Sequence, residues 1–380
     1  MIPYGRQNIT DADVAAVVRA LHEPLLTQGP LVQQFETALA DAVGAQFAVV
    51  VNSGTAALHA AYFAAGVGPG AGVVTTPVTF VATANAAYYL NGNVRFVDID
   101  RDTVLLDPAG LEEVGSGVRV VAPVHFGGNV ANMKSIATIA SNRGWLVVED
   151  AAHALGARYD IDGVEYRVGA CAHSQMCCFS FHPVKHITTG EGGAITTNDP
   201  VLRDSLLRFR SHGITRDPAQ LEMCDGPWFY EQQDLGFNYR ITDVQCALGL
   251  SQLQRLPAIV ERRRQVAAQY DELFSGNPNV RPISTPPWSR SSYHLYVVNV
   301  PASIRRPAFE SLRASGIGVN VHYIPVHLQP YHRARVGTLC LPNAESYYAG
   351  ALTIPMFPEL SRTDVERVAT LVQRVVHEWS

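Results

Sequence analysis

Lys185 is the residue whose surroundings point most clearly to chemistry. It follows an apolar and aromatic run, residues 177–184, and it precedes a glycine-rich turn and a strand-like run, residues 190–193 and 194–197. A lysine between an aromatic wall and glycines lies in a partly dry site, which favours the neutral amine. A neutral amine can act as a nucleophile or form a Schiff base with an aldehyde. A lysine taken alone is more often a surface residue on a loop, so the case for a reactive lysine depends on other segments of the sequence.

Two earlier segments provide the partners that such a lysine needs. Residues 49–58 indicate a strand, a tight turn and a helix whose first N–H groups form a phosphate site with Ser53 and Thr55. Residues 145–149 indicate a buried strand that ends beside Asp150, at the sheet edge where ligands bind in open α/β folds. Pyridoxal 5′-phosphate uses these three features, because a lysine holds its aldehyde, an acid its pyridine nitrogen and a helix start its phosphate. We therefore expect this cofactor.

Five short motifs follow one another along the chain, at residues 53–58, 76–80, 149–153, 180–185 and 236–240. With these motifs the chain resembles the DegT/DnrJ/EryC1/StrS family of sugar aminotransferases, which are fold-type I pyridoxal-phosphate enzymes. The resemblance runs nearly end to end. Residues 2–7 and 26–30 are also similar to one branch of that family. That branch aminates C4 of a UDP-linked 4-keto-6-deoxy-N-acetylhexosamine on the way to pseudaminic acid, with L-glutamate as the expected amino donor.

The resemblance implies roles for four residues at the cofactor ring. Lys185 would link covalently to the aldehyde and, once released, would move a proton between the cofactor and C4 of the sugar. Asp150 would keep the pyridine nitrogen protonated, so that the ring draws electrons from the reacting carbon. His153 would lie near the phenolic oxygen, and Phe80 would stack on the ring. Some members with histidine in place of the lysine are dehydratases, so Lys185 favours transamination.

The resemblance also implies how the phosphate and the sugar nucleotide are held. Residues at the expected helix start would bind the phosphate together with Asn238 of the partner subunit. A homodimer with shared active sites is therefore expected. Besides Asn238, the expected phosphate ligands are Ser53, Gly54, Thr55 and Ser180. The expected substrate contacts are Tyr4, Gln28, Tyr323 and His327.

Composition sets limits on the class of protein. The chain has 380 residues, of which 47% are hydrophobic and 17% charged, and this balance is typical of a well-packed soluble protein with about two domains. A net charge of -5 and a pI near 6.2 give no electrostatic footprint for nucleic acid. No apolar run approaches the roughly 18 residues that indicate a membrane span. We expect no nucleic-acid or membrane partner.

The six cysteines are sparse, and the N-terminal segment lacks the basic and then apolar pattern of a secretion signal. Reduced thiols and a cytoplasmic location are expected. The cluster of cysteines and histidines around residues 171–186 raises the alternative of a zinc site. Cys177 and Cys178 are adjacent in a predicted strand and would point to opposite faces, so we expect no metal.

Apolar strands alternate with helical segments from residue 47 to about 200, which predicts an α/β fold with a mainly parallel sheet covered on both faces. This sheet would form a large domain over residues 1–250, and residues 251–380 would form a smaller α+β domain. Pro257 is expected to interrupt a helical region. The predicted strands are 47–51, 73–75, 94–97, 118–124, 145–149, 175–180, 194–197, 293–300 and 319–323. The predicted helices are 11–22, 31–43, 55–65, 80–90, 108–114, 132–143, 200–211, 243–256, 258–274, 307–315 and 363–379.

Other functions fit these residues less well. A nicotinamide-dependent epimerase or dehydrogenase acting on a sugar nucleotide needs a glycine loop after the first strand, whereas residues 66–72 follow a helix and open a strand. A hydrolase would need a nucleophile elbow, which neither Ser53 nor Cys178 provides. A non-enzymatic regulator that retains the cofactor pocket is a third alternative. The nucleotide (UDP, dTDP or GDP) and the aminated carbon (C3 or C4) stay open.

Overall fold

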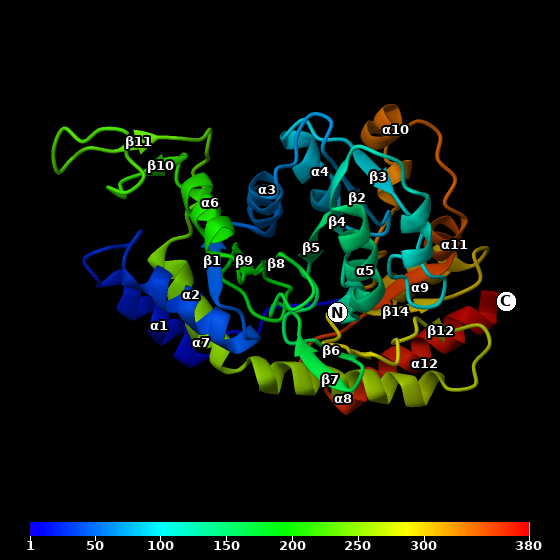
Figure 1. Ribbon diagram of the computed structural model, residues 1–380. Helices are drawn as coiled ribbons and strands as arrows, with labels where there is room; N and C mark the ends of the chain where they lie inside the picture. The colour runs from blue at the N-terminus through cyan, green and yellow to red at the C-terminus, as the bar shows by residue number, and fades with distance from the viewer. Residues whose placement is uncertain (380) are drawn as a thin grey trace.

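A seven-stranded sheet forms the centre of the computed structural model, which describes residues 1–379 (Figure 1). Five neighbouring strands, from β8 to β3, run parallel, and β9 is antiparallel to both of its neighbours. The expected mainly parallel α/β sheet is thus confirmed. In spatial order the strands are β1 (Phe47–Val51), β9 (Gly193–Thr197), β8 (Met176–Ser180), β5 (Leu146–Asp150), β4 (Val118–Ala122), β2 (Gly72–Thr75) and β3 (Val94–Phe96).

Successive strand residues enter two separate hydrophobic cores, one on each face of the sheet. Val147 and Cys177 lie in the core that α2 and α5 cover, whereas Val148 and Cys178 lie in the core under α3, α4 and α6. Because side chains alternate along a strand, a continuous apolar run buries both faces. The helices are α1 (Asp11–Leu21), α2 (Pro30–Val43), α3 (Gly54–Ala64), α4 (Ala82–Tyr89), α5 (Met133–Arg143) and α6 (Pro200–Arg210).

Side-chain caps fix where several of these helices begin. Ser53 accepts a hydrogen bond from the N–H of Ala56 at the start of α3, and Asp199 caps α6 in the same way. Residues 108–114, expected as a helix, form a 3-10 helix, η1 (Pro108–Glu113), rather than an α-helix. Two further 3-10 turns are η2 (Phe126–Gly128) and η3 (Val326–Leu328).

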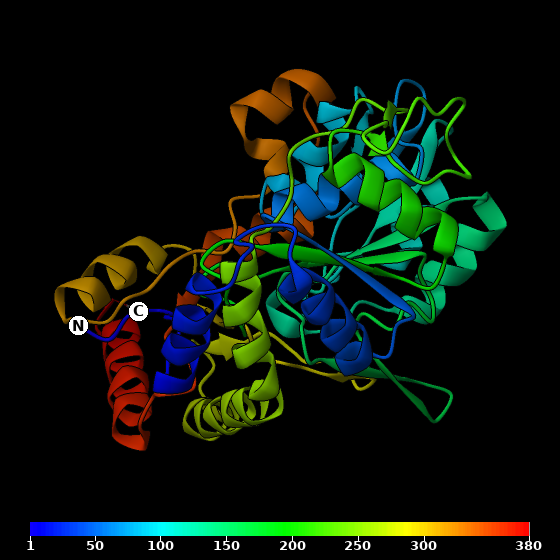
Figure 2. The ribbon, with the colours of Figure 1, turned by 90° about the vertical axis from the view of Figure 1, so that its left-hand side faces the viewer.

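The C-terminal part has a core of its own. Pro257 lies in the first turn of α8, so the helical region breaks into two helices there, as expected. In Figure 2, α1 lies against α7, which leads into α8. The elements of this part are α7 (Asp243–Gln254), α8 (Leu256–Phe274), α9 (Arg305–Ala314), α10 (Pro330–Val336), α11 (Pro342–Gly350), α12 (Arg362–Trp379), β12 (Arg281–Pro282), β14 (Tyr296–Asn299) and β15 (Ala351–Ile354).

The segment around α11 packs against the large sheet and not against the C-terminal core. Val326, Ala344 and Tyr347 belong to the same buried cluster as β2 and β4, whereas α8, α9 and α12 form a third cluster. The chain therefore returns to the large sheet after residue 320. A domain boundary at residue 250 stays a prediction.

Residues 319–323 do not form the expected strand. Only Asn320 makes a bridge, to Thr353, and the ring of His322 is hydrogen-bonded to the hydroxyl of the same Thr353 at 2.8 Å. The side chain of His322 thus takes the place of further ladder pairing. This irregular segment brings Tyr323 toward the central sheet.

Two small antiparallel units were not predicted. The hairpin of β6 (Arg158–Ile161) and β7 (Val164–Arg167) turns at Asp162 and Gly163, both with positive φ, and β13 (Ser289–Arg290) pairs with β6. The second unit, β10 (Ile214–Thr215) with β11 (Glu231–Gln232), lies at the base of an arm that projects from the sheet at the upper left of Figure 1. Among residues 1–379, no helix combines the length and the hydropathy that a bilayer crossing needs.

Candidate active site

A cavity of about 560 Å³ lies at the C-terminal ends of β5 and β8, where the start of α3 and the irregular 320–323 segment meet. Ligands of open α/β sheets bind at this edge. Most of the expected site residues line it, although they come from six segments of the chain. These are Tyr4, Ser53, Gly54, Thr55, Phe80, Asp150, His153, Ser180, Lys185 and Tyr323.

The start of α3 forms one end of the cavity. The N–H groups in the first turn of a helix have no partner within the helix, and the helix dipole favours an anion there. Gly54 allows the closest approach, because a Cβ at this position would lie 2.9 Å from Cβ of Ser180. The first N–H groups of α3 lie on one side of this space and Ser180 lies on the other. Together they form a small polar cradle that suits a phosphate.

Asp150 forms the acidic side of the cavity and is 5% exposed. Its Oδ2 accepts a hydrogen bond from the hydroxyl of Thr83 at 2.6 Å, and its Oδ1 accepts one from the N–H of Ala152 at 3.1 Å. The hydroxyl of Thr79 lies 2.8 Å from that of Thr83. Because the proton of Thr83 goes to the carboxylate, Thr79 donates to Thr83, and this chain orients the carboxylate.

Lys185 lies on a turn after β8, where its N–H donates to the carbonyl oxygen of His182 at 2.9 Å. Burial lowers the pKa of Lys185 to about 8, and the negative charge of Asp150 opposes part of that shift. The amine is therefore partly neutral near pH 7, as a nucleophile toward an aldehyde must be. Gly54, Asp150 and Lys185 thus supply a phosphate cradle, an acid and an amine within one cavity.

The comparison with known sequences agrees with this geometry. The sequence profile of the DegT/DnrJ/EryC1/StrS aminotransferase family matches residues 7–373. The chain belongs to this family. Membership confirms the enzyme class that the five motifs predicted.

Two similar proteins carry more specific descriptions. The chain is 37% identical to the spore coat polysaccharide biosynthesis protein SpsC of Bacillus subtilis, over 99% of this chain and 97% of SpsC. It is also 37% identical to the UDP-4-amino-4,6-dideoxy-N-acetyl-beta-L-altrosamine transaminase of Campylobacter jejuni, over 97% of this chain and 96% of that protein. Both therefore match along almost their whole length.

A solved structure confirms the expected fold. The sugar aminotransferase Spr1654 of Streptococcus pneumoniae, in its PMP form, superposes with a TM-score of 0.92 at 28% identity and covers 100% of both chains. The same protein is also known in a PLP form. This match confirms fold-type I, and with the family it confirms pyridoxal 5′-phosphate as the cofactor of this aminotransferase.

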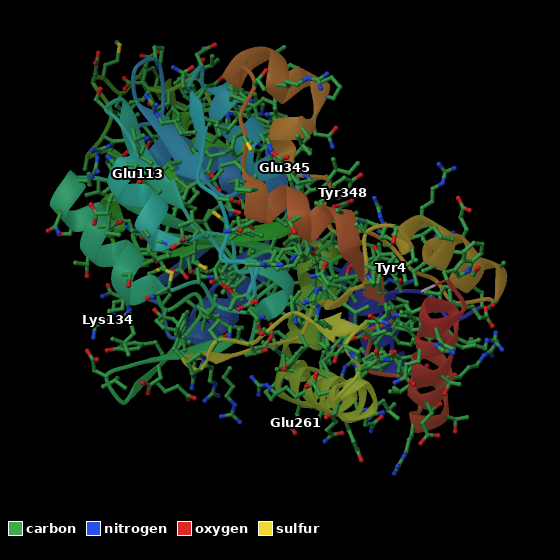
Figure 3. All side chains as sticks on the ribbon, turned by 90° about the vertical axis from the view of Figure 1, so that its right-hand side faces the viewer. Tyr4, Glu113, Lys134, Glu261, Glu345 and Tyr348 are labelled. Atoms are coloured by element: carbon green, nitrogen blue, oxygen red, sulfur yellow. The ribbon has the colours of Figure 1, made fainter. Side chains whose placement is uncertain are left out.

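Three of the expected site residues lie outside the cavity of this aminotransferase. Gln28 and Asn238 are exposed on the surface. His327 is buried, with Nε2 3.2 Å from Oε1 of Glu345, which Figure 3 labels on α11. The position of His327 therefore does not support a contact with the substrate. Tyr4 lies where the N-terminal segment passes the C-terminal elements (Figure 3).

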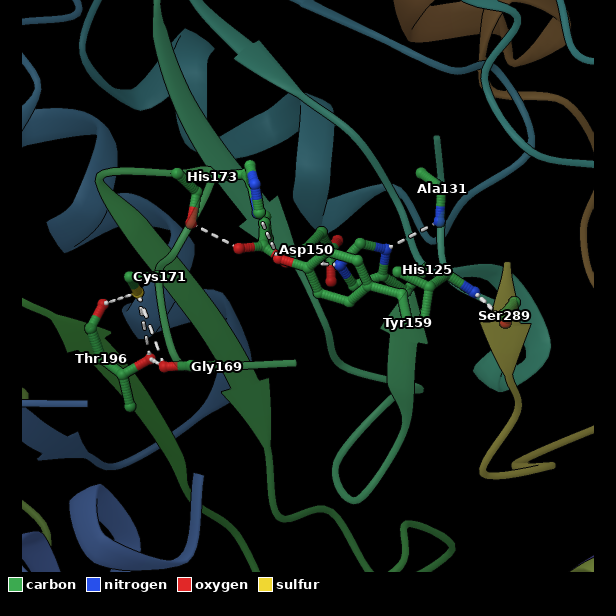
Figure 4. Close-up of polar contacts among 12 residues, drawn as sticks. His125, Ala131, Asp150, Tyr159, Gly169, Cys171, His173, Thr196 and Ser289 are labelled. Atoms are coloured by element: carbon green, nitrogen blue, oxygen red, sulfur yellow. Dashed lines mark hydrogen bonds and ion pairs between the residues drawn. The ribbon is translucent and has the colours of Figure 1, made fainter. Parts of the chain in front are cut away.

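The buried acid next to Asp150 has a structural role. Oε2 of Glu149 lies 2.7 Å from Nε2 of His125, and Oε1 accepts a hydrogen bond from Ser174. Nδ1 of His125 accepts the N–H of Ala131 at 3.2 Å, a contact that Figure 4 shows. Neither Glu149 nor His125 lines the cavity, and their mutual contact holds buried backbone in place.

The two threonines that hold Asp150 were not expected from the sequence. Thr79 belongs to the motif at residues 76–80 and Thr83 follows it by four residues, so the spacing of one helical turn was visible in the sequence. Their link to Asp150 was not, because 67 positions separate Thr83 from Asp150. Among residues 1–379, no group of three or more histidine, cysteine, aspartate or glutamate side chains is arranged to hold a metal.

Proposed function

We propose that this aminotransferase converts a UDP-linked 4-keto-6-deoxy-N-acetylhexosamine into its 4-amino sugar, with L-glutamate as the amino donor. The observation that carries the proposal is the meeting of the α3 start, Asp150 and Lys185 in one cavity. The likeness to the Campylobacter jejuni transaminase over nearly the whole chain supports the choice of sugar nucleotide. The product would serve the synthesis of pseudaminic acid or a related surface glycan.

The residues present fit the cofactor. The approach of Gly54 to Ser180 leaves no room for a side chain, and the lowered pKa of Lys185 favours the reactive amine. Ser53, Gly54, Thr55 and Ser180 would hold the phosphate, Asp150 the pyridine nitrogen and Lys185 the aldehyde. When bound, the cofactor supplies an electron sink for the negative charge at the reacting carbon.

The side chains then handle protons and exclude water. Nζ of Lys185 is the base that takes a proton at the amino-bearing carbon of L-glutamate and gives a proton to C4 of the sugar. Phe80, which is 59% exposed in the single chain, would cover one face of the ring. Tyr4 and Tyr323 line the same cavity and would contact the sugar.

We further propose a homodimer, in which Asn238 of the partner subunit completes each phosphate site. Asn238 is exposed where the projecting arm returns to the sheet, beside Ser211, and large apolar side chains of residues 223–237 are also partly or mostly exposed. Large apolar side chains that are exposed on a single chain are typical of a protein–protein interface when they adjoin one another. Gln28 is also exposed and would approach the cavity of the partner subunit. The apolar side chains are Met223 (64% exposed), Trp228 (70%), Tyr230 (51%), Leu235 (78%) and Phe237 (40%).

A cytoplasmic location completes the proposal. All six cysteines are free, which suits a reducing compartment, and Cys177 and Cys178 are buried on opposite faces of the sheet.

Two lysines make the chemical test unusually sharp, because Lys134 and Lys185 are the only lysines in the sequence. Lys134 is exposed and paired with Asp162 at 2.6 Å. Borohydride reduction of the cofactor-loaded protein should attach the label to Lys185, and Lys134→Arg should label equally well. Label on Lys134 or on the N-terminus would contradict the proposed site.

The substrate test uses L-glutamate with a panel of UDP-, dTDP- and GDP-linked 3-keto and 4-keto sugars. The product is identified by mass and NMR. We expect the 4-amino derivative of the UDP-linked N-acetylhexosamine, and no product from Lys185→Arg. Preference for another ketosugar would contradict the proposed substrate. Because the chain is as similar to SpsC as to the altrosamine transaminase, sugar nucleotides that serve other polysaccharides should be tested first among the alternatives.

A further inference from the structure

Asn52 directly follows β1, precedes Ser53, and binds the segment that carries Asn238. The backbone N–H of Asn52 donates to the carbonyl oxygen of Tyr239 at 2.9 Å. The side-chain Nδ2 of Asn52 donates to the carbonyl oxygen of Asn238 at 3.3 Å, across 186 positions of the sequence. The residue just before the phosphate cradle of a subunit thus also holds the segment that we expect to reach the partner subunit.

The other edge of this segment is fixed by the end of α6. The backbone of residues 237–239 makes two hydrogen bonds of 3.0 Å with the backbone of residues 210–212. These bonds form a short antiparallel bridge in which Ser211 lies opposite Asn238. The main chain of Asn238 is therefore held from both sides, whereas its side chain is exposed.

Tyr239 ties the same segment to the body of α3. Its hydroxyl oxygen lies 2.9 Å from Nδ1 of His59, which is 2% exposed. Its ring stacks on that of Phe237, with the centroids 5.1 Å apart and the planes at 16°. Both neighbours of Asn238 in the sequence are thus anchored by side chains, and the position of Asn238 follows that of α3.

A fixed main chain makes an exposed side chain a better ligand. Ordering a flexible residue at the moment of binding costs conformational entropy, and this cost is subtracted from the affinity. Asn238 avoids much of that cost because Asn52 and residues 210–212 already hold it. Asn52 itself does not line the cavity of its own chain, although Ser53, Gly54 and Thr55 after it do.

We propose that Asn52 is a positioning residue for the phosphate site of the partner subunit, because it sets where the side chain of Asn238 enters that site. The proposal rests on the homodimer of the proposed function, in which Asn238 of each subunit completes the site of the other. In a twofold dimer each subunit gives and receives the same contact. Ser53 then serves the phosphate of its own subunit, and Asn52 serves that of the partner subunit.

The same hydrogen bond also fits a simpler role, in which Asn52 only supports the start of α3 in its own subunit. The two roles differ in the site that suffers when Asn52 is replaced. Mixed dimers separate them. An inactive Lys185→Ala chain is paired with an active chain, and two affinity tags isolate the mixed species. The working site belongs to the active chain and takes Asn238 from the inactive one.

The measured quantity is the pyridoxal phosphate concentration that gives half-maximal activity, which reports on the working site alone. Asn52→Ala in the inactive chain should raise this concentration about twofold to tenfold, as expected for the loss of one hydrogen bond between neutral groups. The same change in the active chain should have a much smaller effect. Asn198→Ala in the inactive chain is the matched control, because the amide of Asn198 also donates to a backbone carbonyl, that of Ala170, at 2.9 Å. It should change nothing.

Asn238→Ala in the inactive chain provides the reference, since it removes the side chain that enters the working site. If the reference raises the half-maximal concentration and Asn52→Ala in the inactive chain does not, the positioning role is overturned and the shared site stands. An effect of Asn52→Ala confined to the active chain would show support of its own cradle and would also overturn the proposal. No effect of the reference itself would mean that the shared site of the proposed function is wrong, and the positioning role with it.

Hydrogen exchange tests the support of the segment without cofactor. In Asn52→Ala apoprotein the backbone amides of residues 236–240 should exchange severalfold faster than in the wild type, whereas those of α5 should not change. Asn198→Ala should leave residues 236–240 as they are in the wild type. Equal exchange of this segment in wild-type and Asn52→Ala proteins would show that the side chain of Asn52 does not hold it, and the proposal would fail at its first step.

Discussion

The hydroxyl of Thr83 lies 2.6 Å from Oδ2 of Asp150, and it joins α4 to the end of β5 in the wall of the active-site cavity. With Thr79 behind it, this contact forms a directed chain in which each hydroxyl donates toward the carboxylate. A hydrogen bond to a charged group is worth more than one between neutral groups. The carboxylate proposed to pair with the pyridine nitrogen is thus held by two hydroxyl groups of the cavity wall.

Thr83→Val tests this support. Valine has the same shape and lacks the hydroxyl, so Asp150 loses one fixed donor, and we expect kcat to fall roughly tenfold, about 1.4 kcal/mol. Thr188→Val is the control, because Thr188 is a buried threonine whose hydroxyl donates to the carbonyl oxygen of Phe181 at 2.9 Å. Steady-state kinetics at saturating substrate provide the comparison, and equal rates in the two variants would remove Thr83 from the mechanism.

The pH dependence of cofactor capture follows from Lys185. With a pKa of about 8, the neutral fraction of the amine rises about tenfold between pH 7 and pH 9. Stopped-flow mixing of apoprotein with pyridoxal phosphate should show a rate that rises through this range and then levels off. A rate that keeps rising beyond pH 10 would indicate an amine with the ordinary pKa of lysine.

The same depressed pKa affects stability with a defined sign. Between pH 8 and about 10.4 the unfolded chain binds a proton at this lysine that the folded apoprotein does not. The contribution of Lys185 to the free energy of unfolding therefore rises with pH over this window. Urea unfolding of Lys185→Met apoprotein should lack this part of the pH dependence, whereas Lys134→Met should retain it.

Gly54→Ala tests the phosphate cradle. The new Cβ would lie 2.9 Å from Cβ of Ser180, and overpacking of this kind costs about 1–3 kcal/mol. We expect weaker binding of pyridoxal phosphate, by about one order of magnitude or more, and a much smaller change for pyridoxal, which has no phosphate. Gly115→Ala, at a position with open space around it, serves as the control. An equal loss for both ligands would contradict the placement of the phosphate.

Shared active sites can be tested by mixing two defective subunits. If Asn238 acts in the cavity of the partner subunit, a heterodimer of Lys185→Ala and Asn238→Ala chains contains one intact site. Coexpression should then restore about a quarter of the wild-type activity, since half of the dimers are mixed and each has one working site. Activity no higher than that of the Asn238→Ala homodimer would place Asn238 outside the site of the partner subunit.

The strands and helices around the cofactor site could be predicted because their signals are local. Apolar runs on both faces, as in residues 47–51 and 145–149, indicate buried strands, and Ser53 caps its own helix within three residues. The segment 319–323 was mistaken for a strand because its alternating pattern says nothing about Thr353, whose hydroxyl binds His322 in place of further pairing.

The sequence by itself determined the fold class, the family and the order in which Gly54, Asp150 and Lys185 reach the cavity. Only the tertiary structure decided which neighbours the expected site residues contact: Thr83 contacts Asp150, Gly127 contacts His153, and Glu345 contacts His327. The physical reason is that periodicity and capping depend on residues a few positions apart, whereas hydrogen-bond direction and the burial that shifts a pKa depend on segments that meet only after the sheet and its helices have packed.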